Sequence, residues 1–325
     1  MQIRSVIYRV LAALFAGVLL LLAGQTSGGG WTARKPEECA LTFTVISDVH
    51  VEGNNFERYK IFARALQDVK RNTANDAVMF LGDSTMNGQN IENLLFHGAV
   101  RSVLGADANV LPVMGNHDIG NGKGDYEQLQ NRWYAYTEAF FGRKLSHPYY
   151  YDVVKGCYCI VLGMEAQTVN ETYISEEQYA WLQGVLALAA ESGKPAFVFS
   201  HYPMSYTVDA DGNDTDRLVN IIAEYNRAHD IFVFVGHTHM PMHLWWSFKT
   251  YNGYPEIYLP RITELAGDDD EPYADTGVGV QVEVYQNEVV VRARDFYRGQ
   301  WKIDQWEDDL PLMERAYALK NPIGE

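Results

Sequence analysis

The 325-residue chain is poor in basic residues and contains no sequence repeat. Lys and Arg total 26 against 42 Asp and Glu, which gives a formal net charge of −16. No run of Lys and Arg interrupts this acidic excess, so we do not expect a protein that binds nucleic acid through its own basic surface. Charged residues make up 21% and hydrophobic residues 47% of the chain. This composition excludes disordered, collagen-like and coiled-coil proteins and predicts a folded domain with a sizeable core.

Cysteine is also scarce, with Cys39, Cys157 and Cys159 as its three occurrences. In an exported protein, the simplest expectation is one disulfide and one free thiol. Cys157 and Cys159 are two residues apart in a strand-like segment, so they would face the same side of it. Because no second pair exists to complete a four-ligand zinc site, we expect a structural or incidental role for the cysteines.

One long apolar run occurs, near the start of the sequence. Arg4 and Arg9 come first, Val10–Ala23 is uninterrupted by polar residues, and small residues follow at 24–30. This order is typical of a secretory signal, and the run is short for a membrane span. No clear A-x-A cleavage site follows, so residues 1–24 are either a signal peptide or a signal anchor. We therefore expect an exported protein, extracellular, periplasmic or facing outward, that contacts a membrane only if this segment is retained.

Five short apolar runs recur further along the chain, and each ends in polar residues. They span Leu41–Ile46, Ala77–Leu81, Val110–Met114, Ala196–Phe199 and Ile231–Val235. Runs that are apolar on both faces are typical of central strands covered by helices. Apolar residues at three-to-four spacing predict helices at 56–69, 179–189 and 218–225, the second beginning with a capping box at residues 175–178. This alternation favours an α/β fold with mostly parallel strands.

Two later segments alternate differently and predict antiparallel hairpins, at residues 149–162 and 278–293. No linker rich in Pro or Ser divides residues 41–300, so we expect a single domain there. Residues 25–40 are expected to be a flexible linker, and residues 301–325 a tail that packs back on the domain.

Polar residues with metal-binding side chains follow the five apolar runs. They are Asp48, His50, Asp83, Asn116, His117, His201, His237 and His239. Ligands bind at the carboxyl ends of strands in open α/β sheets, so we expect these side chains to form one cluster. Each residue alone is most simply structural, but five of the nine histidines lie at these few strand ends. The joint pattern favours a metal site.

The chemistry of the predicted ligands narrows the choice of metal and reaction. Imidazole, carboxylate and amide oxygen without thiolate suit Zn, Fe, Mn, Co or Ni. These candidate ligands are too many for one ion and fit two. Two metal ions about 3.5–4 Å apart can orient a phosphoryl oxygen and activate water, which indicates hydrolysis of phosphate esters.

The polar residues form motifs that occur in a fixed order. They are D-x-H at Asp48 and His50, G-D at Gly82 and Asp83, G-N-H-D at residues 115–118, the lone His201, and G-H-x-H at residues 236–239. With this ordered set the chain resembles the calcineurin-like metallophosphoesterases over roughly residues 41–245. The resemblance implies a four-layer α/β/β/α fold, in which a central β-sandwich of two mixed sheets is flanked by helices, with the catalytic domain at 41–300.

The resemblance also implies roles for the site residues. The first metal ion would be held by Asp48, His50 and His239, and the second by Asn116, His201 and His237, with Asp83 bridging both. A hydroxide that bridges two transition-metal ions would attack phosphorus, while His117 assists the leaving group. Asp118 is expected to orient His117, since groups around a site commonly orient the catalytic ones.

Departures from family patterns bear on the substrate. The segment at 84–88 lacks the Arg that protein Ser/Thr phosphatases place there and the Tyr that purple acid phosphatases use as an iron ligand. Phosphoproteins and an iron–tyrosinate centre are therefore disfavoured. We expect a small-molecule or lipid-derived phosphate monoester or diester, with Asn87, Tyr202 and Tyr206 as candidate contacts. The alternative from another class is a non-catalytic metal-binding scaffold on the same fold.

Overall fold

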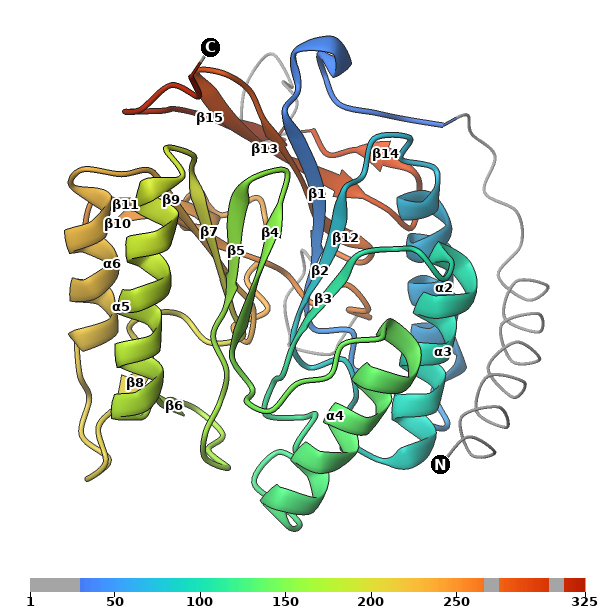
Figure 1. Ribbon diagram of the computed structural model, residues 1–325. Coiled ribbons are helices and arrows are strands. Elements are labelled where there is room, and N and C mark those ends of the chain that lie inside the picture. Colours follow the sequence, from blue (N-terminus) through green and yellow to red (C-terminus); the bar gives the residue numbers. More distant parts are fainter. Residues whose placement is uncertain (1–29, 266–274, 304–312, 325) are drawn as a thin grey trace.

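The computed structural model describes residues 30–265, 275–303 and 313–324 (Figure 1). The predicted signal segment at 1–24 lies outside these residues. Within the described ranges, none of the helices has the length and apolar character needed to cross a bilayer.

One sheet combines strands from the start and the end of the domain. In spatial order it contains β14 (Gln300–Trp301), β13 (Glu288–Asp295), β12 (Val278–Val284), β1 (Leu41–Ile46), β2 (Ala77–Leu81) and β3 (Val110–Val113), and β15 (Glu314–Ala318) also pairs with β13. β1, β2 and β3 are parallel, whereas β12 is antiparallel to β1 and to β13. The sheet is therefore mixed, with its parallel part at one side.

The second sheet is built from the middle of the chain. In spatial order it contains β10 (Phe248–Tyr251), β11 (Tyr254–Tyr258), β9 (Ile231–Val235), β7 (Ala196–Ser200), β5 (Cys157–Val161) and β4 (Tyr150–Val154). Its central strands β11, β9, β7 and β5 are parallel, and an antiparallel hairpin partner closes each side. A small pair, β6 (Thr172–Tyr173) with β8 (Thr207–Val208), lies apart from both sheets.

The two sheets pack face to face, and helices cover their outer faces. Figure 1 shows α5 (Glu176–Glu191) and α6 (Arg217–Asn226) beside one sheet, and α2 (Phe56–Lys70) and α3 (Asn90–Leu104) beside the other. α4 (Tyr126–Phe141) packs against α3, and short 3₁₀ helices occupy Pro36–Glu38 (η1) and Trp245–Ser247 (η2). This arrangement confirms the four-layer α/β/β/α fold.

Aromatic side chains fill the space between the sheets. Phe43 of β1 is fully buried, and its ring centroid lies 4.9 Å from that of Phe197, 5.7 Å from Phe199 and 6.0 Å from Phe234. Because the last three belong to β7 and β9, one side chain joins the first sheet to the centre of the second.

Local signals explain two helix starts, with one difference from expectation. The Asn55 side chain accepts from Arg58 N at the start of α2, and Ser175 Oγ accepts from Gln178 N at the start of α5. The predicted capping box at 175–178 is incomplete, however. The Gln178 side chain instead exchanges two hydrogen bonds with the backbone of Gly163, at 2.9 and 3.0 Å. The Gln178 side chain, which the sequence pattern assigns to the helix cap, therefore binds Gly163 instead of the Ser175 backbone.

The expectation of one disulfide is wrong, because all three cysteines are free thiols. Cys157 and Cys159 alternate with Tyr158 in β5 and are buried in the apolar layer between the sheets. Cys39 precedes β1 and donates to the carbonyls of Leu41 and Val284. Packing between the sheets therefore uses the two buried thiols as small apolar groups.

Residues 30–40 also differ from the flexible linker that we expected, because they lie against the domain. The Trp31 ring packs edge-on against Trp301 at 5.4 Å, and its Nε1 donates to Asp68 O at 2.9 Å. Arg34 forms ion pairs with Glu288 and Glu314 on β13 and β15, at 3.1 and 2.8 Å. These contacts tie residues before the first strand to the last strands of the same sheet.

The sandwich core generates a stability prediction. We expect Phe43→Ala to lower the free energy of unfolding by about 3–5 kcal/mol, because truncating a fully buried Phe loses transfer energy and leaves a cavity. Urea unfolding followed by circular dichroism measures the change. Phe56→Ala is the matched control, since that side chain is 52% exposed and should change stability by no more than about 0.5 kcal/mol. Equal losses in the two variants would contradict the assignment of Phe43 to the inter-sheet core.

Candidate metal centre

The candidate site lies where five strands end, three from one sheet and two from the other. Asp48 and His50 follow β1, Asp83 follows β2, and Asn116 and His117 follow β3. His201 follows β7, and His237 and His239 follow β9. The sandwich therefore brings together the side chains that sequence analysis assigned to one cluster.

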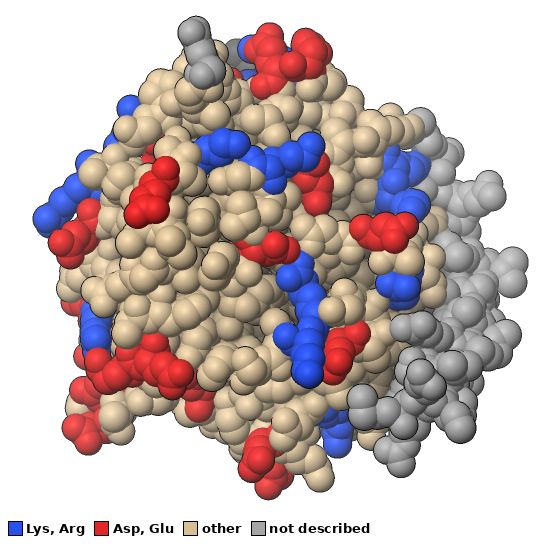
Figure 2. All heavy atoms as spheres, in the orientation of Figure 1, with Lys and Arg blue, Asp and Glu red and all other residues tan. Residues whose placement is uncertain are grey.

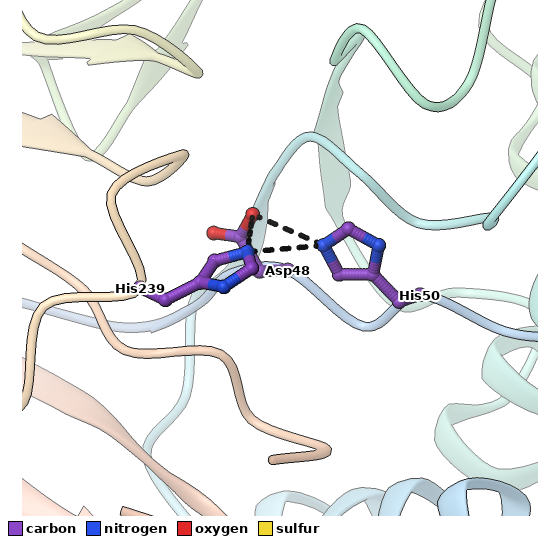
Figure 3. Close-up of side chains that lie close together, drawn as sticks. All are labelled: Asp48, His50 and His239. Carbon is purple, nitrogen blue, oxygen red and sulfur yellow. Dashed lines mark hydrogen bonds and ion pairs between the residues drawn. The ribbon is translucent and has the colours of Figure 1, made fainter. Parts of the chain in front are cut away.

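The first group of ligands consists of Asp48, His50 and His239 (Figure 3), whose side chains point toward one another. His239 Nε2 lies 3.3 Å from Asp48 Oδ1 and 3.2 Å from His50 Nε2, and His50 Nε2 lies 3.5 Å from Asp48 Oδ1. Asp48 and His50 are buried, whereas the His239 side chain is 21% exposed. The group is thus open to solvent on the His239 side.

A second group surrounds Asp83, whose Oδ2 lies 3.5 Å from His50 Nε2 and 3.3 Å from His201 Nε2. Asn116 Oδ1 lies 2.9 Å from His201 Nε2, while the Asn116 amide donates to Asn121 Oδ1 at 2.9 Å. The hydrogen bond to Asn121 orients the amide so that its oxygen faces His201. Asp83 thus stands between the two groups, in the place expected for a bridging ligand.

His237 is held beside the second group through its ring. Its ring centroid lies 5.1 Å from that of His201 and 4.3 Å from that of Tyr202. Three sets of side chains have ligand atoms within 4.8 Å of one another: Asp48, His50 and His239; His50, Asp83 and His117; and Asp48, Asp83 and His201. His237 belongs to none of these three sets, and its place beside the cluster is given by its contact with the His201 ring.

Acceptor atoms that face acceptor atoms make the cluster suitable for cations. His201 Nδ1 lies 2.8 Å from Leu81 O, and since a carbonyl can only accept, Nδ1 carries the hydrogen. Neutral His201 would therefore point an Nε2 lone pair at the oxygens of Asp83 and Asn116. Asp48 Oδ1 is buried and makes no hydrogen bond within the described residues. Separations of 3.2–3.5 Å are close to the roughly 3.4 Å between ligands of a tetrahedral ion with bonds of about 2.1 Å.

The pKa values reflect the same crowding of charge. Burial opposes ionisation of Asp48, but contacts with His239 and His50 hold its pKa well below the usual value. Burial also opposes the charged form of His201, yet the adjacent Asp83 carboxylate raises the pKa of His201 to about 9. In contrast, burial lowers the pKa of both His50 and His237 to about 4. Without metal, His50 and His237 are therefore neutral near pH 7, whereas His201 is protonated and would have to release that proton to bind a metal ion.

Backbone strain marks the same residues. Five candidate ligands have a left-handed backbone: Asp48 (φ 53°), His50 (φ 44°), Asp83 (φ 47°), His237 (φ 64°) and His239 (φ 49°). For L-residues this conformation costs about 1–2 kcal/mol each. Such strain persists where the surrounding structure imposes it, and it gathers at functional sites. Here it turns each side chain into the cluster directly after its strand.

Two glycines of the motifs leave space for the ligands. A Cβ on Gly115 would overlap the Asp83 carboxylate and backbone nitrogen, and a Cβ on Gly236 would overlap Ser47 Oγ and the Asp48 carboxylate. The glycines in G-N-H-D and G-H-x-H are therefore required by the close approach of ligand side chains from neighbouring strands.

The structure corrects the predicted role of Asp118. Its carboxylate accepts from Thr85 N and Oγ1, both at 2.9 Å, and from Gly115 N at 3.0 Å. His117 Nδ1 instead lies 2.7 Å from Met86 O. Asp118 thus joins the loops after β2 and β3, and the Met86 carbonyl orients the imidazole. Burial and the charge of Asp83 raise the pKa of Asp118 to about 7. The donors that contact this carboxylate are neutral, so they do not offset the rise as an adjacent cation would.

The candidate substrate contacts separate into two kinds. Tyr202 is 1% exposed, so it cannot be a direct contact for a substrate, contrary to expectation. Tyr206 is 43% exposed and lines a cavity of about 430 Å³. Asn87 lines another cavity of about 450 Å³, although its amide also donates to Glu92 at 3.1 Å. The lining of neither cavity includes a candidate metal ligand, so a contact of Tyr206 or Asn87 with substrate stays a prediction.

Sequence reasoning missed the backbone carbonyls of Leu81 and Met86 and the side chain of Asn121. The carbonyls fix the hydrogen positions of His201 and His117, and Asn121 fixes the amide of Asn116. Asn121 precedes Gly122, a pair that signals a turn. No sequence signal distinguishes the two carbonyls, because every residue has one.

A family model described as calcineurin-like phosphoesterase matches residues 41–241, from β1 through the G-H-x-H motif. The chain belongs to the calcineurin-like phosphoesterase family. Its enzyme class is therefore that of hydrolases acting on phosphoric esters, and the clustered acceptors described above provide this calcineurin-like phosphoesterase with potential metal ligands.

Solved structures share the fold of this calcineurin-like phosphoesterase. A dimetal phosphatase from Danio rerio matches with a TM-score of 0.54 and 18% identity, over 79% of this chain and 97% of that one. A purple acid phosphatase from yellow lupin (Lupinus luteus) seeds matches with a TM-score of 0.56 and 14% identity, over 80% of this chain and 52% of that one. A comparison with curated protein sequences finds no match.

The strained ligand backbone yields a prediction for the metal-free protein. His239→Gly and His239→Ala both remove the imidazole, but glycine adopts φ 49° without the Cβ penalty. We expect the glycine variant to be more stable by about 1 kcal/mol in chelator, as measured by urea unfolding.

The control pair lies in a helix, where the order should reverse. Leu188 in α5 is 43% exposed, so Leu188→Gly should be less stable than Leu188→Ala by about 0.5–1 kcal/mol. An alanine variant at 239 as stable as the glycine variant would show that the left-handed backbone there is not strained.

Proposed function

We propose that the protein is an exported phosphoesterase that uses two transition-metal ions to hydrolyse a small or lipid-derived phosphate ester. The observation that carries the proposal is the convergence of buried acceptor atoms from five strand ends, with Asp83 between two groups. Two carboxylates and several imidazoles buried this closely need positive charge beside them. Export rests on the apolar segment at 10–23, which precedes the described residues.

In this proposal Asp48, His50 and His239 hold one ion, and Asn116, His201 and His237 hold the other, with Asp83 shared. The support is that Asp48, His50 and His239 form one close group. Asn116 and Asp83 lie beside His201 Nε2, and the His237 ring packs against the His201 ring. Such ions supply Lewis acidity, which polarises a phosphoryl oxygen and acidifies bound water. Donors of nitrogen and oxygen without thiolate fit Mn, Fe, Zn, Co or Ni.

His117 is the proposed general acid. Its Nδ1 hydrogen is committed to Met86 O, so Nε2 is the atom left to carry a proton to a departing alkoxide oxygen. His117 N also donates to Asp83 Oδ1 at 2.9 Å. This hydrogen bond fixes the His117 backbone to the proposed bridging ligand, which supports a position of the imidazole close to the reacting phosphoryl group.

The distribution of charge supports a compact substrate. In the face that Figure 2 shows, acidic and basic side chains are interspersed across the surface. The net charge of −16 includes Asp48 and Asp83, whose charge bound cations would offset locally. The remaining acidic excess repels large polyanions, so the proposed substrate presents one phosphate ester to the site.

The first test concerns Asp83. We expect Asp83→Asn to lower metal content and to reduce turnover about 10³-fold or more, since a metal ion contributes several kcal/mol to the transition state. The measurements are elemental analysis of metals and hydrolysis of a chromogenic phosphodiester and monoester with manganese, with and without chelator. Asp209→Asn, at an exposed carboxylate outside the cluster, should behave as wild type. Near-normal turnover by Asp83→Asn would overturn the site, and a wild-type protein with two metals but no turnover on any ester would favour the scaffold.

The second test concerns His117. His117→Ala should retain its metals but lose about 10²–10⁴-fold in kcat for esters of alcohols with high pKa, because these leaving groups need a proton. Nitrophenyl esters should lose much less. Comparing kcat across a series of leaving groups, together with metal analysis, measures this difference. Loss of the metals in this variant would identify His117 as a ligand instead.

A further inference from the structure

The imidazoles around the candidate centre are oriented in different ways. His201 and His117 each have a backbone carbonyl partner at Nδ1, from Leu81 at 2.8 Å and Met86 at 2.7 Å. Metal-binding histidines usually have such a partner on the second nitrogen, which fixes the ring plane and the tautomer. For His237, the hydrogen bond that the structure gives is on the backbone nitrogen, to Asp48 Oδ2 at 3.1 Å. Within the described residues, its ring has no corresponding partner.

Aromatic rings surround His237 instead. The Tyr202 ring lies 4.3 Å from the His237 ring at an interplanar angle of 43°, and the Tyr206 ring lies 6.2 Å away at 83°. Tyr202 also packs edge-on against His201 at 5.1 Å. One tyrosine therefore contacts both imidazoles of the second group.

Tyr202 is itself firmly fixed. Its side chain is 1% exposed, and its hydroxyl donates to Val169 O at 3.0 Å. It packs in a buried cluster with Met164 and Trp133. Tyr206, by contrast, is 43% exposed. The buried ring has both the contact and the rigidity that orienting His237 requires.

We propose that Tyr202 is a positioning residue that holds the His237 imidazole in its ligand orientation through ring packing, in place of a hydrogen bond. The Tyr202 hydroxyl anchors that ring to the loop between β5 and β6. The proposal rests on the proposed function in that His237 is taken as a metal ligand. Orientation of the ring, however, is a property of the metal-free protein and is measurable there.

The experiment compares Tyr202→Leu, which removes the ring, with Tyr202→Phe, which keeps the ring but removes the hydroxyl. Met164→Ala is the control for damage to the same buried cluster, and thermal unfolding establishes that each variant folds. The first readout is NMR relaxation and chemical shift of the His237 ring in chelator. Removing the ring should increase the motion of the His237 imidazole and abolish its ring-current shift, while Tyr202→Phe and Met164→Ala stay near wild type.

The second readout is metal affinity, measured by competition of manganese with a chelator. Tyr202→Leu should weaken the second ion about 10–100-fold, the range found when groups that orient a ligand are removed. The first ion should be unaffected, and Tyr202→Phe should recover most of the affinity for the second.

Unchanged His237 motion in Tyr202→Leu would overturn the proposal. Equal losses of affinity for the first and the second ion in Tyr202→Leu, with the same losses in Met164→Ala, would also overturn it. A wild-type protein that binds no pair of ions but whose His237 ring is freed by Tyr202→Leu would refute the proposed function and leave the positioning role supported.

Discussion

The constraint on which the structure depends is the burial of acceptor atoms against one another. Asp48 and Asp83 lose their hydration, and the groups nearest to their oxygens include imidazole nitrogens that are themselves acceptors when neutral. Such a cluster is stable only with protons or cations inside it. Two features of the backbone allow this cluster to form. Asp48 and Asp83 adopt left-handed φ values, and Gly115 and Gly236 lack the Cβ atom that would overlap the two carboxylates.

The β-sandwich supplies the rigid frame for that assembly. Parallel strands in each sheet end at the same edge, and packing of Phe43 against β7 and β9 keeps the two edges adjacent. Ligands from both sheets can therefore meet although they are far apart in sequence. Between strand and cluster, short backbone contacts do the finer positioning. The carbonyl of Leu81 orients His201, and Asp118 joins the two loops that carry Asp83 and Asn116.

Most of the fold and the members of the cluster follow from sequence, because buried strands and the polar residues after them leave a simple pattern. Helix α3 was not predicted, because its buried face contains the polar residues Glu92, Asn93 and His97 and so lacks a clear apolar stripe. The antiparallel pairing of β12 with β1 joins segments more than 200 residues apart, so no local pattern predicts it. The true contacts of Asp118 could not be predicted, because a carboxylate before a turn has many donors within reach and only the folded chain selects among them.

The segment that carries Trp31 shows where the chain enters the domain relative to the metal cluster. Trp31 pairs with Asn72 just after α2 ends, whereas α2 begins just after the D-x-H ligands. The 15 residues of this helix span about 22 Å, so the chain enters the domain at the end opposite the metal cluster. The segment before β1 and the candidate metal ligands thus occupy opposite ends of the same sheet.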